Sequence, residues 1–550
     1  MRLSGADILI QCLKEQGADT VFGYPGGCVL DIYDAIYRDG TLKHILTAHE
    51  QGAAHAADGY ARATGKTGVC IATSGPGATN LVTGIATAYM DSVPLVAITG
   101  NVTVANLGRD SFQEVDIAGI TMPVTKHNYI VKDINKLAAT VREAFYIASS
   151  GRKGPVLIDI PKNIQTEQCE FTPATPVPYL PKPVAAEALK EVASALAKSK
   201  RPLLIAGGGC IGSNASDDLF ALAKKMQAPV CATLMGLGAY PASDEQFLGL
   251  IGMHGTDAAA KAFRRADTVI ACGMRFSDRV AGNRAAFAEG KTIVQFDIDA
   301  AEIDKNVKTN LSVMADVKEI FKTLLPLLEQ ADHKDWLKEV SAYKEYESAN
   351  FDSALPAYRI LHALRSFTQP DTRVATDVGQ HQMWTAQYYP FERPRTLISS
   401  GGLGTMGFGM GAAIGACVGT GKKTVLVTGD GSFHMNLNEL CTAVSHELPL
   451  VILLMDNNCL GMVRQWQTLF YGKRYSQTTL DRKTDYCKLA EAFGATGMTI
   501  ACEKDILPVL EKAFAAKGPV LVDCKIGIDD KVLPMIAPGK SFEDIITKLD

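Results

Sequence analysis

An acidic residue between two glycines and a pair of asparagines lie one predicted helix and one predicted strand apart near the end of the chain. Asp430 follows the apolar run TVLVT (424–428), and Asn457 follows the next apolar run, PLVILLM (449–455). Because ligands of an open parallel sheet bind beyond the carboxyl ends of its strands, both side chains are predicted to reach one crevice. One carboxylate, one amide oxygen and waters suit Mg²⁺, a hard cation that usually adds phosphate oxygens to its octahedron. A pair of turns rich in Asp and Asn is the alternative explanation.

The glycines beside Asp430 favour an anion-binding turn. Gly429 and Gly431 let the backbone approach a ligand closely and leave the start of a helix open to a phosphate. No lysine of the Walker type follows them, so the turn is not a nucleoside-triphosphate loop.

The order G-D-G (429–431) then N-N (457–458) resembles the diphosphate–magnesium motif of thiamine-diphosphate enzymes. Such enzymes need one carboxylic acid in an apolar setting, with a pKa shifted so that it can move a proton at the cofactor near neutrality. Glu50, at a predicted strand-to-helix junction in HEQGAAHAADG (49–59), matches that activating glutamate. The stretch TSGPGATN (73–80) matches the glycine turn beside it. A solvated glutamate at the start of a helix is the alternative.

The bulk composition predicts a multidomain α/β protein. The chain has 550 residues, of which 47% are hydrophobic and 21% charged, and this length suggests three or four domains. A net charge of −4 gives no reason to expect a nucleic-acid or membrane partner, and the apolar stretch near 448–455 is too short to span a bilayer. The N-terminal segment predicts a helix capped near Ser4 rather than a signal peptide. Thirteen scattered cysteines without a C-x-x-C pair favour free thiols and a cytoplasmic location.

Alternating apolar and helical stretches predict an α/β fold of three doubly wound parallel-sheet domains. Similar runs such as GPVLIDI (154–160) and GPVLVDC (518–524) indicate that the first and third domains are related, although buried parallel strands in general look alike. A proline-rich linker (172–183) and a charged helical connection (329–350) are predicted between them. The predicted domains are an N-terminal pyrimidine-binding domain (1–170), a central FAD-binding domain (185–335) and a C-terminal diphosphate and Mg²⁺-binding domain (355–550).

The chain resembles the catalytic subunits of acetohydroxyacid synthases (acetolactate synthases) over nearly its whole length. The stretches that carry the resemblance are FGYPGG, SFQE, VGQHQMW, GGLGTMGFG and GMVRQWQ. The resemblance implies thiamine diphosphate, Mg²⁺ and FAD as cofactors. It also implies decarboxylation of pyruvate and addition of the hydroxyethyl unit to a second 2-oxo acid. Pyruvate as acceptor gives 2-acetolactate, and 2-oxobutyrate gives 2-aceto-2-hydroxybutyrate, for the biosynthesis of valine, leucine and isoleucine.

The resemblance assigns the site residues of the first and third domains. Met406 is implied to bend the thiamine cofactor, and the cation ligands are implied to be Asp430, Asn457 and the backbone carbonyl of Cys459. The implied catalytic set is Glu50, Phe112, Gln113, Lys162, Met462, Val463 and Trp466. The implied thiamine-diphosphate set is Gly26, Gly27, Glu50, Pro76, Asn80, Gln380, His381, Gly404, Met406, Gly431 and Ser432.

Glycine turns after strands of the middle domain suit a dinucleotide diphosphate. Arg275 and Arg279 can offset its charge, and Asp297 is placed to accept from a ribose hydroxyl. A G-x-G-x-x-G fingerprint is missing, so the pattern alone leaves FAD open and the resemblance favours it. The implied FAD set is Arg152, Gly207, Gly208, Gly209, His254, Gly255, Arg275, Asp278, Arg279, Asp297, Ile298 and Asp316.

Several other functions remain as alternatives. The closest are a flavin-free catabolic acetolactate synthase, a pyruvate oxidase and glyoxylate carboligase, which lacks the activating glutamate. The segment GMVRQWQ favours a carboligase pocket over an oxidase. Intact Glu50, Asp430 and Asn457 disfavour a non-catalytic homologue, and the missing fingerprint disfavours an NAD dehydrogenase. Asn101 and Thr103 depart from common family residues, which affects the expected inhibitor sensitivity.

The resemblance also bears on assembly. It implies a homodimer or homotetramer in which Glu50 of one chain serves the thiamine held by another. It leaves open whether a small regulatory subunit binds and whether valine inhibits.

Overall fold

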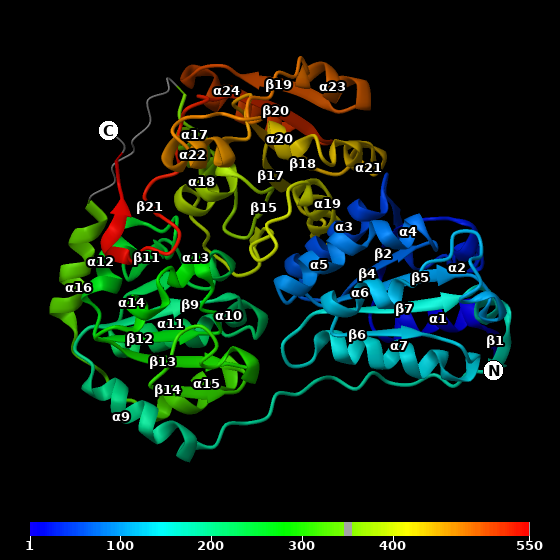
Figure 1. Ribbon diagram of the computed structural model, residues 1–550, viewed down its shortest axis with the longest axis horizontal. Helices are drawn as coiled ribbons and strands as arrows, with labels where there is room; N and C mark the ends of the chain where they lie inside the picture. Colours follow the sequence, from blue (N-terminus) through cyan, green and yellow to red (C-terminus); the bar gives the residue numbers. More distant parts are fainter. Residues whose placement is uncertain (346–354, 549–550) are drawn as a thin grey trace.

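The computed structural model describes residues 1–345 and 355–548 and contains three six-stranded parallel sheets covered by helices (Figure 1). We call the three sheets with their helices the first, middle and third units. The predicted architecture of three doubly wound parallel sheets is confirmed, and the apolar runs quoted above form strands. The central strands of each sheet are buried on both faces because helices cover the sheet, which is why these strands are nearly continuous apolar runs, whereas edge strands such as β6 and β19 are partly exposed.

The first unit has the strand order β3-β2-β4-β5-β7-β6. The predicted cap is confirmed, since the Ser4 hydroxyl accepts from the Asp7 backbone N–H at the start of α1 (3.2 Å). Its parallel strands are β2 (Thr20–Tyr24), β3 (Lys43–Leu46), β4 (Gly68–Ala72), β5 (Leu95–Asn101), β6 (His127–Ile130) and β7 (Pro155–Pro161). Its helices are α1 (Gly5–Glu15), α2 (Leu30–Asp39), α3 (Glu50–Thr64), α4 (Pro76–Asn80), α5 (Val82–Met90), α6 (Ile117–Thr121), α7 (Ile134–Ser149) and α8 (Lys162–Thr166); β1 (Arg2–Ser4) and β8 (Gln168–Glu170) pair antiparallel beside them.

The third unit has the order β16-β15-β17-β18-β20-β19. Counted from each unit's own first strand, the first and third sheets both read 2-1-3-4-6-5, which confirms that the two units are alike in topology. Its strands are β15 (Arg373–Thr376), β16 (Leu397–Ile398), β17 (Thr424–Gly429), β18 (Leu450–Asp456), β19 (Thr496–Ile500) and β20 (Val520–Lys525). Its helices are α17 (Ala357–Leu364), α18 (Gln380–Tyr388), α19 (Phe408–Thr420), α20 (Asp430–Phe433), α21 (Leu440–Ser445), α22 (Gly461–Phe470), α23 (Tyr486–Phe493) and α24 (Ile506–Ala515).

The middle unit has a different order, β11-β10-β9-β12-β13-β14, which reads 3-2-1-4-5-6. This is the order of the dinucleotide-binding doubly wound fold, and the strand order reverses between β9 and β12, where a crevice forms. Its strands are β9 (Pro202–Ala206), β10 (Val230–Ala232), β11 (Phe247–Leu250), β12 (Thr268–Cys272), β13 (Thr292–Asp297) and β14 (Leu311–Met314). Its helices are α9 (Lys190–Lys198), α10 (Gly208–Gly212), α11 (Ser216–Met226), α12 (Asp257–Arg265), α13 (Asp278–Ala281), α14 (Arg284–Ala288) and α15 (Val317–Leu324).

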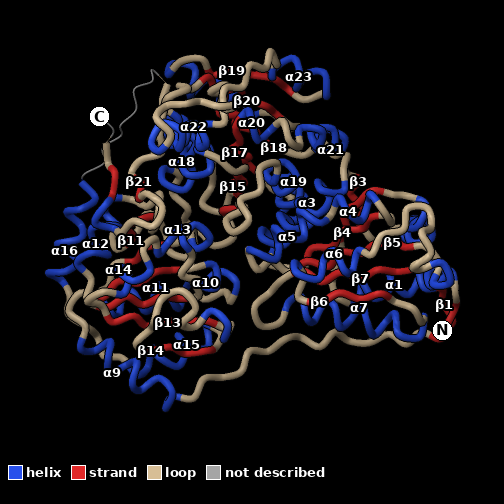
Figure 2. Tube along the Cα trace, viewed as in Figure 1, coloured by secondary structure: helices blue, strands red, loops and turns tan. Residues whose placement is uncertain are grey.

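Two connections join the units along the chain. The predicted proline-rich linker (172–183) has no regular structure and runs as a long loop from the first unit to the middle one (Figure 2). The predicted charged connection contains α16 (Lys334–Ser341), while its last residues, 346–350, lie outside the described residues.

The first and third units meet through α3 and α19. A Cβ on Gly415 would collide with the carbonyl oxygen of Ala56, and one on Gly411 would lie 2.8 Å from the carbonyl oxygen of Gly52. The two helices therefore run in the same direction at a separation that only glycine permits. This confirms that the small residues after Glu50 serve close packing.

The end of the chain leaves the third unit and lies against the middle one, where β21 (Met535–Ile536) pairs with β22 (Ile545–Ile546) (Figure 1). The Ile536 backbone N–H donates to the Met253 carbonyl (2.8 Å), and the Phe542 ring lies 4.3 Å from that of Phe263. We call residues 526–546 the C-terminal segment. It ties the third unit to the middle unit.

The cysteines and the helices agree with the expectations from composition. All thirteen cysteines are free thiols. Among the residues described, none of the helices combines the length and the apolar character needed to cross a membrane.

Candidate functional site

The ends of β17 and β18 form the first part of the site. The strands are adjacent and parallel, with Gly429 opposite Met455, so Asp430 and Asn457 emerge side by side. Their exposed fractions are only 2% and 7%. Burial and the nearby Asp456 carboxylate raise the pKa of Asp430 to about 7. The described residues contain no group of three His, Cys, Asp or Glu side chains suited to a metal, so a cation here would depend on amide, carbonyl and cofactor oxygens as well as Asp430.

The start of α18 lies against this strand edge. The Asn457 Nδ2 atom donates to Gln380 Oε1 (3.3 Å), and a Cβ on Gly429 would lie 2.8 Å from His381 Nδ1. Burial lowers the pKa of His381 to about 3, so its imidazole is neutral at physiological pH. Its Nε2 atom has no hydrogen-bond partner among the described residues. A buried, unpaired nitrogen beside a glycine turn fits a diphosphate oxygen.

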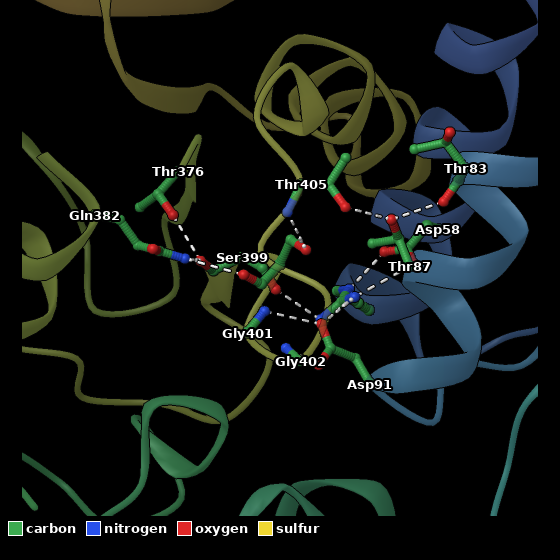
Figure 3. A network of polar contacts seen from close by, with 12 residues as sticks. Asp58, Thr83, Thr87, Asp91, Thr376, Gln382, Ser399, Gly401, Gly402 and Thr405 are labelled. Atoms are coloured by element: carbon green, nitrogen blue, oxygen red, sulfur yellow. Dashed lines mark hydrogen bonds and ion pairs between the residues drawn. The ribbon is translucent and has the colours of Figure 1, made fainter. Parts of the chain in front are cut away.

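The loop that carries Gly404 and Met406 is held by a buried ionic network from the first unit (Figure 3). The Asp91 carboxylate accepts from the backbone N–H groups of Gly401 (3.0 Å) and Gly402 (2.7 Å). The Arg62 guanidinium pairs with Asp91 (3.0 Å) and donates to the Ser399 carbonyl (2.8 Å). Because this network is buried, it fixes the loop relative to α3 and α5.

The same loop is also held from within the third unit. Gln382 Nε2 donates to the Ser399 hydroxyl (2.8 Å) and to the Ser400 carbonyl (3.1 Å). The Asp377 carboxylate accepts from the Gly407 N–H (2.8 Å), next to Met406, and burial raises its pKa. Met406 therefore sits on a short loop with fixed points on both sides.

One cavity of about 1950 Å³ is bounded by all three units. It joins the switch point of the middle sheet to the loop of Met406 and to one side of α22. The predicted FAD residues that line it are Arg152, Gly208, Gly209, His254, Arg275, Asp278, Arg279, Asp297, Ile298 and Asp316, and the other predicted residues are Gly404, Met406, Met462, Val463 and Trp466. Gly207 and Gly255 adjoin this lining without being part of it.

The middle-unit part of the cavity has the chemistry of a dinucleotide site. A Cβ on Gly209 would lie 2.7 Å from the Gly273 Cα, so this turn after β9 depends on glycine. Burial and the neighbouring carboxylates of Glu302 and Asp299 raise the pKa of Asp297 to about 6. The buried His254 has an unpartnered Nδ1 within the described residues, and burial lowers its pKa to about 4. Unsatisfied polar atoms at the switch point fit a polar ligand.

Arg152 and Trp466 have specific partners across unit boundaries. The Arg152 guanidinium pairs with Asp299 and Glu302, both at 2.9 Å, so it joins the first unit to the middle unit as well as lining the cavity. The Arg279 guanidinium lies 5.9 Å from the centre of the half-buried Trp466 ring. Trp466 therefore lines the cavity, and it also packs against the buried cluster of Met253, Leu533 and Met535.

The predicted residues of the first unit form a separate group. Asn80 Nδ2 donates to Glu50 Oε2 (3.0 Å), and Lys162 Nζ donates to the Gly27 carbonyl (3.3 Å). Phe112 is 86% exposed. None of these residues lines the cavity, and neither do Gly26, Pro76 and Gln113. Asp430, Asn457, Gln380 and His381 are likewise outside the cavity lining, while Glu439 of the third unit accepts from the Ala48 and His49 N–H groups just before Glu50.

Sequence reasoning missed the residues that hold others in place. Asp377 and Gln465 are buried, the side chain of Asp91 is also enclosed, and each of the three bonds to backbone groups. Asp377 could have been found, because it directly follows β15 at the same strand edge as Asp430. Asp91 and Gln465 lie inside or after helices, where the sequence carries no such signal.

Comparison with known families accounts for the three units. Models for thiamine pyrophosphate enzymes match residues 3–120 (N-terminal TPP binding domain), 189–324 (central domain) and 377–524 (C-terminal TPP binding domain). The Escherichia coli acetolactate synthase isozyme 2 large subunit is 44% identical over 100% of both chains. The chain belongs to the acetolactate synthase large-subunit family. Other relatives are the Haemophilus influenzae acetolactate synthase large subunit (42% identical, 99% of this chain and 98% of the relative) and a probable acetolactate synthase large subunit of Methanocaldococcus jannaschii (44%, 99% and 95%).

Membership of this family confirms the resemblance noted from the sequence. The chain is a thiamine-diphosphate-dependent enzyme with an N-terminal and a C-terminal TPP-binding domain. The middle unit, with its 3-2-1-4-5-6 sheet, coincides with the family's central domain.

Proposed function

We propose that this acetolactate synthase family member decarboxylates pyruvate and transfers the two-carbon unit to a second 2-oxo acid. Pyruvate would give 2-acetolactate, and 2-oxobutyrate would give 2-aceto-2-hydroxybutyrate, for the synthesis of valine, leucine and isoleucine. The observation that supports the proposal most is one cavity whose wall includes both Met406, which we propose bends the thiamine cofactor, and Trp466, which we propose lines the acceptor pocket.

Asp430, Asn457 and the Cys459 carbonyl would hold Mg²⁺, and Gly431, Ser432, His381 and the backbone N–H of Gln380 at the start of α18 would hold the diphosphate. The near-complete burial of Asp430 and the unpaired His381 Nε2 support this set. When bound, thiamine diphosphate supplies the nucleophilic carbon and the electron sink that pyruvate decarboxylation requires. The protein's part is to orient the ring with Met406, exclude water and move a proton through Glu50.

FAD would occupy the middle-unit part of the cavity. The strand order 3-2-1-4-5-6, the glycine turn at Gly208 and Gly209, and Arg275 and Arg279 beside it support a dinucleotide. The purified protein should then be yellow, with a flavin spectrum that anaerobic pyruvate does not bleach. Bleaching would favour a pyruvate oxidase, and a colourless active protein would favour the catabolic synthase.

The active enzyme would be at least a homodimer. Glu50 lies on the first unit with Asn80, whereas Asp430 and Asn457 lie on the third unit, and a second chain would bring its Glu50 to the thiamine ring held here. Mixing two inactive variants, Glu50→Gln and Asp430→Ala, should restore activity, because a hybrid dimer contains one site with both native residues. No recovery in a dimer proven to be hybrid would overturn this arrangement.

Further parts of the proposal follow from the relatives. Their name, large subunit, supports a small regulatory partner for this chain. We also propose a cytoplasmic location and the domain boundaries 1–170, 185–335 and 355–550.

The direct test is incubation with pyruvate, thiamine diphosphate and Mg²⁺, then acid treatment and an assay for acetoin. Acetoin that depends on both cofactors is the expected result. Pyruvate consumption without acetoin would reject the carboligase assignment.

A further inference from the structure

Gln465 is a fully buried glutamine on α22 that the functional assignment leaves without a role. Its Oε1 atom accepts from the Val532 backbone N–H (2.8 Å), and its Nε2 atom donates to the Val532 carbonyl (3.0 Å). Because a backbone N–H only donates and a carbonyl only accepts, this pair allows one orientation of the Gln465 amide. The C-terminal segment therefore fixes where the Gln465 oxygen lies.

The orientation of Gln465 determines that of Gln380. The Gln380 Nε2 atom faces two acceptors, Gln465 Oε1 (3.1 Å) and the Asp530 carbonyl (2.7 Å). Both of its protons are thus used, and its oxygen must point the other way. All these groups are buried, so a flipped Gln380 amide would set acceptor against acceptor in a medium without water.

Gln380 in turn orients Asn457. The Gln380 oxygen accepts from Asn457 Nδ2 (3.3 Å), and the Cys459 backbone N–H donates to Asn457 Oδ1 (3.3 Å). A Cβ on Gly461 would collide with Gln380 Oε1, so glycine at 461 leaves room for this contact. Asn457 therefore keeps its oxygen, the atom that binds cations, away from Gln380.

We infer that Gln465 is a positioning residue for the cation site. The Val532 backbone fixes the orientation of the Gln465 amide, and Gln465 fixes that of Gln380. Gln380 in turn orients Asn457 so that the Asn457 oxygen faces the cation. This inference rests on the proposed function, in which Asn457 binds Mg²⁺. It adds that the C-terminal segment, which also contacts the middle unit, sets the geometry of the metal site.

The test measures the dissociation constant of Mn²⁺, used in place of Mg²⁺, from the loss of its free-ion electron paramagnetic resonance signal with thiamine diphosphate present. Gln465→Met keeps the length and volume of the side chain but removes its polar atoms. It should weaken Mn²⁺ binding about tenfold or more, as changes to groups that orient metal ligands do. Gln465→Glu, whose buried carboxyl is expected to stay protonated, still accepts from Val532 and Gln380 and donates its O–H to the Val532 carbonyl, so it should stay nearer the wild-type value.

Gln387→Met on α18 is the matched control. Gln387 Nε2 donates to the carbonyls of His254 (2.9 Å) and Leu533 (3.5 Å), so its loss loosens the same C-terminal segment without touching Gln380. Mn²⁺ binding should be unchanged in this variant. Equal weakening in Gln387→Met and Gln465→Met would overturn the inference, because general loosening would then explain both.

Two further experiments address a variant that does not fold and the recovery of turnover by added Mg²⁺. If Gln465→Met does not fold, Gln465→Asn, which is one methylene too short to span Val532 and Gln380, carries the same expectation. Excess Mg²⁺ should restore the turnover of the weakened variant at an unchanged KM for pyruvate. Wild-type Mn²⁺ affinity in a folded Gln465→Met or Gln465→Asn variant overturns the inference, whereas wild-type protein without thiamine-dependent Mn²⁺ binding overturns the proposed function.

Discussion

The first and third units share one strand order and meet through equivalent helices, yet their equivalent strand ends carry different residues. Helix α3 begins with Glu50, which is half-buried and bonded to Asn80, whereas α19 begins with Phe408, which is fully buried. The end of β17 carries Asp430 between glycines, whereas the equivalent end of β4 carries a glycine turn without an acid.

The two units share a topology, but their residues at the sheet edge suit different chemistry. The shared topology places the loops that follow the parallel strands of each unit at one sheet edge, but only the residues in those loops make one edge suited to proton transfer and the other to an anion and a cation. Four single-residue substitutions test this difference between the first and third units.

The largest effect is expected at the first unit's acid. Glu50→Gln keeps the size and polarity of the side chain but removes the ionisable group, so turnover should fall roughly 10²–10⁴-fold with cofactor binding intact. Steady-state kinetics and calorimetric titration with thiamine diphosphate measure the two quantities. Glu439→Gln is the control, because Glu439 accepts from the Ala48 (3.1 Å) and His49 (3.0 Å) N–H groups before α3, and its loss should lower thermal stability more than turnover. Near wild-type turnover in Glu50→Gln would remove the proton-transfer role.

At the third unit's acid, Asp430→Ala should weaken cation binding by about 100-fold or more, since groups that only orient ligands already cost 10–100-fold. The flavin content should not change, because the predicted FAD residues lie mainly on the middle unit. Mn²⁺ titration and the flavin absorbance of the same sample measure both. Parallel loss of the two cofactors would point to unfolding and would count against the assignment of Asp430.

Trp466 marks a further difference between the two units, because no described residue at the equivalent position of the first unit lines the cavity. 2-Oxobutyrate is one methylene larger than pyruvate, and an apolar wall distinguishes one methylene by roughly 1–3 kcal/mol. Trp466→Leu should therefore reduce the preference for 2-oxobutyrate about tenfold, measured from both products in competition. Phe493→Leu, on α23 and outside the lining, should leave the ratio unchanged. An unchanged ratio in a stable Trp466→Leu enzyme would leave the indole with a packing role only.

The smallest effect concerns the contact that the two units share. Gly415→Ala places a Cβ against the Ala56 carbonyl, so it should destabilise the protein by about 1–3 kcal/mol through overpacking. Gly518→Ala, where a Cβ would meet nothing within 4 Å, should change stability by less than about 0.5 kcal/mol. Thermal unfolding of both variants tests this, and equal melting temperatures would show that α3 and α19 can separate without cost.

The sequence predicted the elements and the strand ends well, because buried parallel strands and glycine turns leave local patterns. Asp430 and Asn457 were placed at one sheet edge from their positions after two apolar runs, and β17 and β18 do lie side by side. The relation between the first and third units followed from their similar strand runs. The catalytic roles of the site residues stay predictions.

The amino-acid sequence alone showed where strands such as β17 and β18 end, because strand and helix periods depend on neighbours along the chain. Only the tertiary structure decided that Arg62 and Asp91 hold the loop of Met406, that the cavity spans three units, and that Val532 orients Asn457 through two glutamines. These contacts join residues far apart in sequence. Several of them end on backbone carbonyl or N–H groups, which all residue types carry except for the N–H that proline lacks, so the residue types do not reveal these contacts.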